Sequence, residues 1–337
     1  MNSSINKNRN NTLEILKLFA SYMVVFIHVL FYGNLGSIVE ALARFAVPFF
    51  FLVSGFYSYK ITTSKIKKRI IHIIKLYVFA LVSYTLFDVI LSVISHNSDY
   101  IPIYFSEYFN LNKIINLFIF NEPIYNGHLW YLFALIYVYI IFYFITKHQI
   151  NEKILFIIAG SLLVLQLLLG ECLSAFGVII PIMYIRNFAL IGIPFFIFGL
   201  FAKKYQNKLC NIPNFVLIIS IVIGSLESVW SRFSIEKNEL CIGSLFIMFA
   251  FAVIFIKYSN IKYPPIVDEL TGCSTYVYIF HSMVCSIIVI VYGKLNLDYF
   301  SSSTLQMIQP ILVCITSTVL AYGITKIEKF FVKKLKR

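Results

Sequence analysis

The chain has 337 residues, of which 60% are apolar and 13% charged, and its mean hydropathy is +0.84. Soluble domains have about 45–50% apolar and about 25% charged residues, so this balance excludes both a water-soluble globular protein and a disordered chain. Lysine and arginine outnumber aspartate and glutamate by 28 to 15. In a membrane protein such an excess marks cytoplasmic segments beside anionic lipid, and we expect no nucleic-acid binding. The cysteines and histidines have no metal-ligand spacing, so we expect no metal site.

Long apolar runs dominate the chain. A helix needs roughly 20 apolar residues to cross a hydrocarbon core of about 30 Å, and such runs predict an all-α integral membrane protein with about ten transmembrane helices, multi-pass in the cell membrane. Glycine and proline inside some runs, at Pro48, Gly192 and Pro194, predict packed and locally broken helices. The ten runs are Leu13–Tyr32, Ala41–Ser58, Ile70–Ile94, His128–Thr146, Ile154–Gly170, Ile185–Ala202, Asn214–Trp230, Leu240–Ile256, Ser274–Gly293 and Ile308–Thr325.

Basic residues indicate the orientation of these spans, because lysine and arginine are retained on the cytoplasmic side. With the N-terminus inside, 20 of the 28 fall on cytoplasmic segments, six on external segments and two inside spans. Both termini are therefore expected to be cytoplasmic. We expect a cytoplasmic N-terminal segment 1–12 without a cleavable signal, a single ten-helix membrane domain 13–326 and a basic cytoplasmic tail 327–337. The longest loop, 95–127, is expected to face outward.

Ionisable side chains inside the first two spans are candidates for function, because burying them in a bilayer is costly. Lys17 and His28 are eleven residues apart, close to three helical turns, so both should project from one face about 16 Å apart. Snorkelling of Lys17 and packing of His28 are the alternatives. Arg44 enters the second span near the exit of the first, and its guanidinium suits a carboxylate, phosphate or oxyanion. Deeper in that span, Ser54 and Gly55 should let helices approach closely.

More polar side chains are expected at the external ends of other spans. Trp130 alone would be typical of an aromatic belt. The polar side chains expected at these ends are His128, Trp130, Arg186 and Glu227. Together with His28 and Arg44 they supply two imidazoles, two guanidiniums and a carboxylate near one depth. This combination suits a general base, an oxyanion stabiliser and an orienting group.

On the cytoplasmic side, Arg69, His72 and Lys75 lead into the third span. Lipid contact explains most of this basic segment. Lys75 lies about four residues deep, however, where its charge suits a polyphosphate ligand that enters from the cytosol. His281 lies in the middle of the ninth span, where a helix-packing histidine is an equal alternative.

Four motifs in order resemble the membrane-bound acyltransferase 3 family, bacterial ten-span proteins that O-acylate cell-surface carbohydrates. Lys17 and His28 fit its signature of a basic residue, ten intervening residues and a histidine. Residues 44–56 (RFAVPFFFLVSGF) are similar to its second span, residues 128–132 (HLWYL) to the opening of its fourth, and residues 278–281 (YIFH) to its late Y-x-x-H element. The resemblance covers nearly the whole chain and extends to the membrane part of serine-racemase resistance proteins, although no racemase domain is expected here.

One part of the chain departs from that pattern. The family often has R-x-x-R-x-x-P at the entry to the third span, where this chain has Arg69, His72 and Lys75. The donor-binding residues that the resemblance implies therefore differ from the family's pattern at this entry.

The resemblance implies a membrane-bound O-acyltransferase. It would transfer an acyl group, expected to be acetyl, from acyl-CoA to a hydroxyl of a cell-surface carbohydrate or exopolysaccharide. Acetyl-CoA would be a substrate, with no tightly bound cofactor, and the other partners would be the carbohydrate acceptor, the lipid bilayer and polysaccharide synthesis machinery. The residues implied are His28, Arg44 and Lys17 as catalytic; His128, Trp130, Arg186 and Glu227 for the acceptor; and Arg69, His72 and Lys75 for the donor.

Two other classes of protein fit parts of this pattern. An exporter or flippase of a polysaccharide or lipid-linked intermediate would also use ten spans with broken helices, but no inverted repeat is visible. A scaffold in a polysaccharide synthase complex would leave Lys17 and His28 unexplained.

Overall fold

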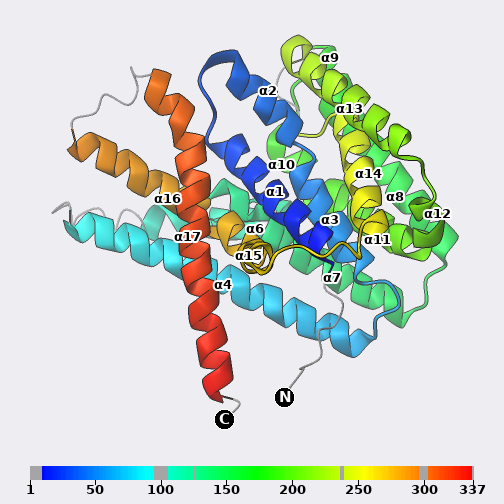
Figure 1. Ribbon diagram of the computed structural model, residues 1–337, viewed down its shortest axis with the longest axis horizontal. Helices are drawn as coiled ribbons and strands as arrows, with labels where there is room; N and C mark the ends of the chain where they lie inside the picture. Colours follow the sequence, from blue (N-terminus) through cyan, green and yellow to red (C-terminus); the bar gives the residue numbers. More distant parts are fainter. Residues whose placement is uncertain (1–9, 95–104, 125, 236–238, 296–302, 336–337) are drawn as a thin grey trace. The chain divides into compact units, whose positions relative to one another are not determined.

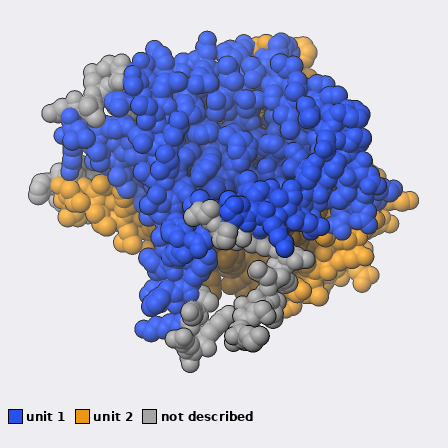
Figure 2. Space-filling model, in the orientation of Figure 1, with its two compact units in different colours: residues 1–50, 205–233, 241–337 blue, residues 51–204, 234–240 orange. Residues whose placement is uncertain are grey.

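The computed structural model describes residues 10–94, 105–124, 126–235, 239–295 and 303–335, and the described chain consists of helices with no strand (Figure 1). The chain divides into two compact units (Figure 2). Unit 1 comprises residues 1–50, 205–233 and 241–337, and unit 2 comprises residues 51–204 and 234–240. The all-α class predicted from the sequence is confirmed.

Eight helical stretches within the described residues are long and apolar enough to cross a membrane, and they overlap eight of the ten predicted spans. The other two predicted spans are shorter or more polar helices, α1 (Asn11–His28) with 18 residues and α14 (Ile242–Lys257) with 16. The count of ten and the side on which the termini lie stay predictions. The eight stretches are Gly33–Phe56, Thr63–Ile94, Gly127–Lys147, Glu152–Ala175, Ile182–Lys204, Asn214–Ser234, Ser274–Lys294 and Ser303–Phe331.

Unit 1 is built around α1, which packs against α2 (Gly33–Ala43), α14, α15 (Pro265–Thr271), α16 (Ser274–Lys294) and α17 (Ser303–Leu335). Its core is a cluster of small and β-branched side chains that includes Val25, Val277 and Val313. The remaining helices of unit 1 are α12 (Gln206–Cys210) and most of α13 (Asn214–Ser234). The arrangement buries one face of α1, the helix that carries Lys17 and His28.

In unit 2, α7 (Trp130–Lys147) packs against α4 (Thr63–Ile94) and the π-helix η3 (Phe188–Gly192), and α8 (Glu152–Leu167) packs against α11 (Ile193–Lys204). Large apolar side chains of α4, among them Val82, Leu86 and Ile90, are exposed, as expected of a helix that faces lipid. The shorter elements are α6 (Leu111–Phe120), η1 (Gly127–Leu129), η2 (Leu168–Cys172), α9 (Leu173–Ala175) and α10 (Ile182–Ile185). Helix α3 (Ala46–Phe56) contributes residues to both units.

Several helices extend beyond the apolar runs predicted as spans. The second helical stretch begins at Gly33, not Ala41, and α17 continues to Leu335, so the predicted tail is helical through that residue. Lysine and glutamate are good helix formers, and hydropathy marks only the apolar part of a helix that extends beyond the membrane. For the same reason α4 begins at Thr63, inside the basic segment, and α6 lies within the predicted loop 95–127.

The predicted breaks and close approaches are confirmed. The π-helix η3 ends at Gly192, two residues before Pro194, whose missing N–H interrupts the regular hydrogen-bond ladder. A Cβ built on Gly55 would overlap the carbonyl oxygen of Phe196, so α3 and α11 touch through their backbones there. The small residue at position 55 is therefore required by helix packing.

Candidate functional site

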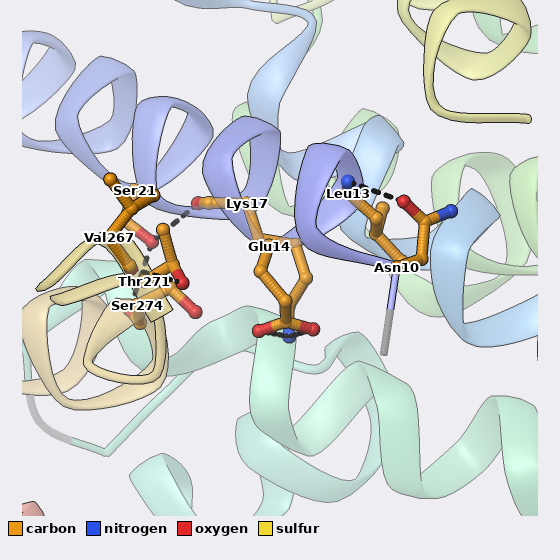
Figure 3. A network of polar contacts seen from close by, with 8 residues as sticks. All are labelled: Asn10, Leu13, Glu14, Lys17, Ser21, Val267, Thr271 and Ser274. Atoms are coloured by element: carbon orange, nitrogen blue, oxygen red, sulfur yellow. Dashed lines mark hydrogen bonds and ion pairs between the residues drawn. The ribbon is translucent and has the colours of Figure 1, made fainter. Parts of the chain in front are cut away.

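Lys17 forms an ion pair with Glu14 one turn earlier on α1, with 3.2 Å between Nζ and a carboxylate oxygen (Figure 3). The start of the helix is anchored nearby, because Asn10 caps it by accepting a hydrogen bond from the Leu13 N–H at 3.0 Å. Ser21 donates to the carbonyl oxygen of Ser274 at 2.9 Å, which joins α1 to α16 (Figure 3). The charge of Lys17 is thus partly balanced within its own helix.

His28 is the last residue of α1, and its side chain is exposed. Its ring centroid lies 5.4 Å from that of His281 on α16, which is fully buried. Nδ1 of His281 lies 2.8 Å from the carbonyl oxygen of Tyr278. A carbonyl oxygen only accepts, so Nδ1 carries a proton and donates this hydrogen bond. An exposed imidazole therefore lies beside a buried one, an arrangement suited to moving a proton.

Arg44 lies at the junction of α2 and α3, eleven residues after Gly33. Its position at the external entry to a span stays a prediction. Its guanidinium donates to Glu40, whose carboxylate is buried and also accepts from Arg232 Nη2 at 2.9 Å. Two guanidiniums thus share one carboxylate, which leaves the cluster with a net positive charge. The cluster can bind an anion or a developing oxyanion while Glu40 holds Arg44 in place.

Glu40 and Arg232 were missed by the sequence analysis. The spacing of Glu40 and Arg44, four residues apart on a helix, is a signal that could have paired them. Nothing local pairs Glu40 with Arg232, which is 192 residues away in the chain.

Replacing Glu40 with glutamine is expected to lower the free energy of unfolding by about 3–5 kcal/mol, because two guanidiniums would lose their shared counter-charge in a buried place. The partial exposure of Arg232, 23% of its side chain, favours the lower end of this range. The measurement is thermal or denaturant unfolding of the purified protein in detergent.

The matched control is Glu152→Gln, since Glu152 pairs with Lys204 at the surface, where half of the Glu152 side chain is exposed. A surface pair is worth less than about 1 kcal/mol. Equal losses in the two variants would show that the pairing around Glu40 is no more important than a surface ion pair.

Three of the predicted acceptor residues lie together in unit 2. His128 is buried in η1, with Nε2 3.5 Å from the hydroxyl of Tyr84. Trp130 opens α7, and the guanidinium of Arg186 lies over its ring at 5.8 Å from the centroid. Arg186 also forms an ion pair with Glu239, with 3.9 Å between Nη1 and Oε2. Tyr84 and Glu239 add two polar groups that the sequence analysis did not single out.

Glu227, the fourth predicted acceptor residue, lies in unit 1 on α13 and accepts a hydrogen bond from the backbone N–H of Gly243. Gly243 is the second residue of α14, so the carboxylate lies at a helix N-terminus, where unpaired N–H groups and the helix dipole favour a negative charge. The structure gives Glu227 a helix-capping contact. An additional contact with substrate stays a prediction.

The predicted donor residues lie in different surroundings on α4. His72 and Lys75 are exposed. Arg69 is half-buried and lies over the ring of Tyr139. Its guanidinium donates to Ser58 Oγ at 2.7 Å, the Tyr57 carbonyl oxygen at 2.9 Å and the Tyr139 hydroxyl at 3.2 Å. Within the described ranges, no group of three or more histidines, cysteines or carboxylates could hold a metal ion.

Comparison with known proteins identifies the family to which the chain is similar. A family model described as an acyltransferase domain matches residues 10–326. A protein named amino-acid racemase from Enterococcus faecalis is 24% identical over 315 residues, which cover 84% of this chain and 42% of that protein. The chain thus spans less than half the length of this curated relative. No solved structure matches.

Proposed function

This chain belongs to the acyltransferase 3 family, and from that premise we propose that it is an O-acyltransferase of the cell membrane. Acyl transfer by a multi-pass membrane protein follows from the family and the apolar helices. The finer proposal is that acetyl-CoA donates an acetyl group to a hydroxyl of a cell-surface carbohydrate. The observation that carries it is the His28–His281 pair, because such a transfer needs a base for the hydroxyl proton.

In the proposed reaction His28 removes the proton of the acceptor hydroxyl as its oxygen attacks the thioester carbonyl carbon. The new C–O bond gives a tetrahedral intermediate whose oxyanion faces the positive cluster of Arg44, Glu40 and Arg232. Collapse of the intermediate breaks the C–S bond, and the proton held by the imidazole passes to the departing thiolate. His281, whose ring centroid lies 5.4 Å from that of His28, orients the His28 imidazole in this proposal. This route requires the thioester to reach His28 within the membrane domain.

The other predicted residues supply binding in this proposal. Arg186, held over Trp130 and near Glu239, offers guanidinium donors to carbohydrate hydroxyls, and His128 lies two residues from Trp130. At the other predicted face of the membrane, the exposed side chains of His72 and Lys75 suit the phosphates of coenzyme A.

The racemase name belongs to the Enterococcus faecalis relative, and we do not extend it to this chain. The 315 aligned residues overlap most of the region 10–326 that the acyltransferase model matches. The shared segment is therefore the acyltransferase domain.

The proposal is tested by the O-acyl ester content of surface polysaccharide, measured by NMR in a deletion strain. We expect the ester signals to disappear in the deletion strain, to return with the wild-type gene and to stay absent with His28→Ala. Unchanged ester content, with a change in the quantity or location of polymer, would overturn the proposal and make export the leading account.

A further inference from the structure

Unit 2 contains a cavity of about 400 Å³ whose lining residues have no role in the steps proposed above. It lies between the ends of α7 and α11, the start of α8 and the turn that follows α3. Its volume is in the range of small-ligand sites. Most of its wall is apolar, formed by side chains such as Phe142, Leu155, Leu200 and Phe201.

Two ammonium groups and one carboxylate line the same cavity. Lys204 pairs with Glu152, and the Nζ of Lys60 lies 5.3 Å from the ring centroid of Tyr59. The lining therefore carries a net positive charge. Lys60 is also two residues from Ser58, which accepts a hydrogen bond from Arg69, so a further guanidinium lies close by in the chain. A ligand of this cavity should have both an apolar part and an anionic part.

The backbone at the rim of the cavity is strained at two positions. Lys60 has φ +56° and Gln149 has φ +52°, both in the left-handed region. The two other non-glycine residues with positive φ in the described chain are asparagines, which tolerate this region, whereas lysine and glutamine gain nothing from it. Strain of this kind persists where the surrounding structure imposes it, and it is concentrated at ligand sites.

We infer that this cavity binds a phosphate-bearing amphiphile. Its apolar part would lie against Phe142 and Phe201, and its phosphate would lie between Lys60 and Lys204, where charge-assisted hydrogen bonds form. Two sources share this chemistry: an anionic phospholipid of the surrounding membrane and the acyl-CoA donor. Only the second rests on the proposed function.

The strained backbone provides a variant that removes the charge without harming the fold. Lys60→Gly deletes the ammonium group and also relieves the positive φ, so it should fold at least as well as the wild type. Thr146→Trp fills the cavity, whose wall includes Thr146. Lys60→Arg keeps the charge, and Lys68→Gln removes an exposed lysine that does not line the cavity.

The experiment uses the full chain in nanodiscs of neutral lipid and two probes, phosphatidylglycerol counted by native mass spectrometry and acetyl-CoA followed by calorimetry. We expect Lys60→Gly and Thr146→Trp to weaken the affinity of the protein for one of the two probes by about tenfold or more. A loss of this size is equivalent to one charge-assisted hydrogen bond. Lys60→Arg and Lys68→Gln should bind as the wild type does.

The probe whose binding is weakened identifies the source. Weaker binding of phosphatidylglycerol assigns the cavity to a membrane lipid, and this result would stand even if no acyl transfer were found. Weaker binding of acetyl-CoA assigns the cavity to the donor. If neither Lys60→Gly nor Thr146→Trp weakens either probe more than Lys68→Gln does, the inference is overturned.

Discussion

Replacing His28 with alanine is expected to lower the rate of acetyl transfer by about 10²–10⁴-fold, the usual contribution of a positioned general base. His281→Ala should cause a large loss as well, because the buried ring lies 5.4 Å from His28, between ring centroids. The rate losses caused by replacing residues that act as a unit are not additive. The His28→Ala/His281→Ala double variant should therefore be scarcely slower than His28→Ala alone. The measurement is the initial rate of transfer from acetyl-CoA by the purified protein.

The control for this prediction is His148→Ala, which removes an exposed imidazole just after α7 and should leave both the rate and the thermal midpoint unchanged. Folding of each variant is checked by its unfolding midpoint. Multiplicative losses in the double variant would show that the two rings act independently. A rate within a few-fold of wild type in His28→Ala would remove the imidazole from the mechanism.

Replacing Gly55 with alanine is expected to destabilise the protein severely, by about 3 kcal/mol or more, which is the upper end for overpacked cores. The added Cβ would overlap the carbonyl oxygen of Phe196, and backbone cannot rotate away as a flexible side chain can. Gly199→Ala should have a similar effect, because its Cβ would overlap the Leu52 carbonyl oxygen on the same pair of helices. The measurements are the yield of monodisperse protein in detergent and its thermal midpoint.

Gly160→Ala is the matched control for the glycine variants. Gly160 lies inside α8, and a Cβ there would meet nothing within 4 Å. Alanine is the better helix former by about 1 kcal/mol, so the control should keep or raise the midpoint. A Gly55→Ala protein that purifies and melts like the wild type would show that α3 and α11 do not approach closely at this point.

The sequence by itself determined the class of the protein and the character of its helices. In a bilayer the backbone polar groups of a single segment can be satisfied only if the segment is helical, so long apolar runs predict helices. Eight of the ten predicted spans are helical stretches long and apolar enough to cross a membrane. Close approach at Gly55 and interruption near Gly192 and Pro194 were likewise predictable, because glycine and proline act locally on the backbone.

Only the tertiary structure decided how the ionisable residues are grouped. Arg232 reaches Glu40 across 192 residues of chain, and His281 meets His28 because α16 packs against α1. Glu227, selected as a binding residue, contacts the backbone of Gly243 at the start of α14. Hydropathy gives the depth of a side chain, but its partners depend on the rotation and contacts of each helix, which are set by packing between segments distant in sequence.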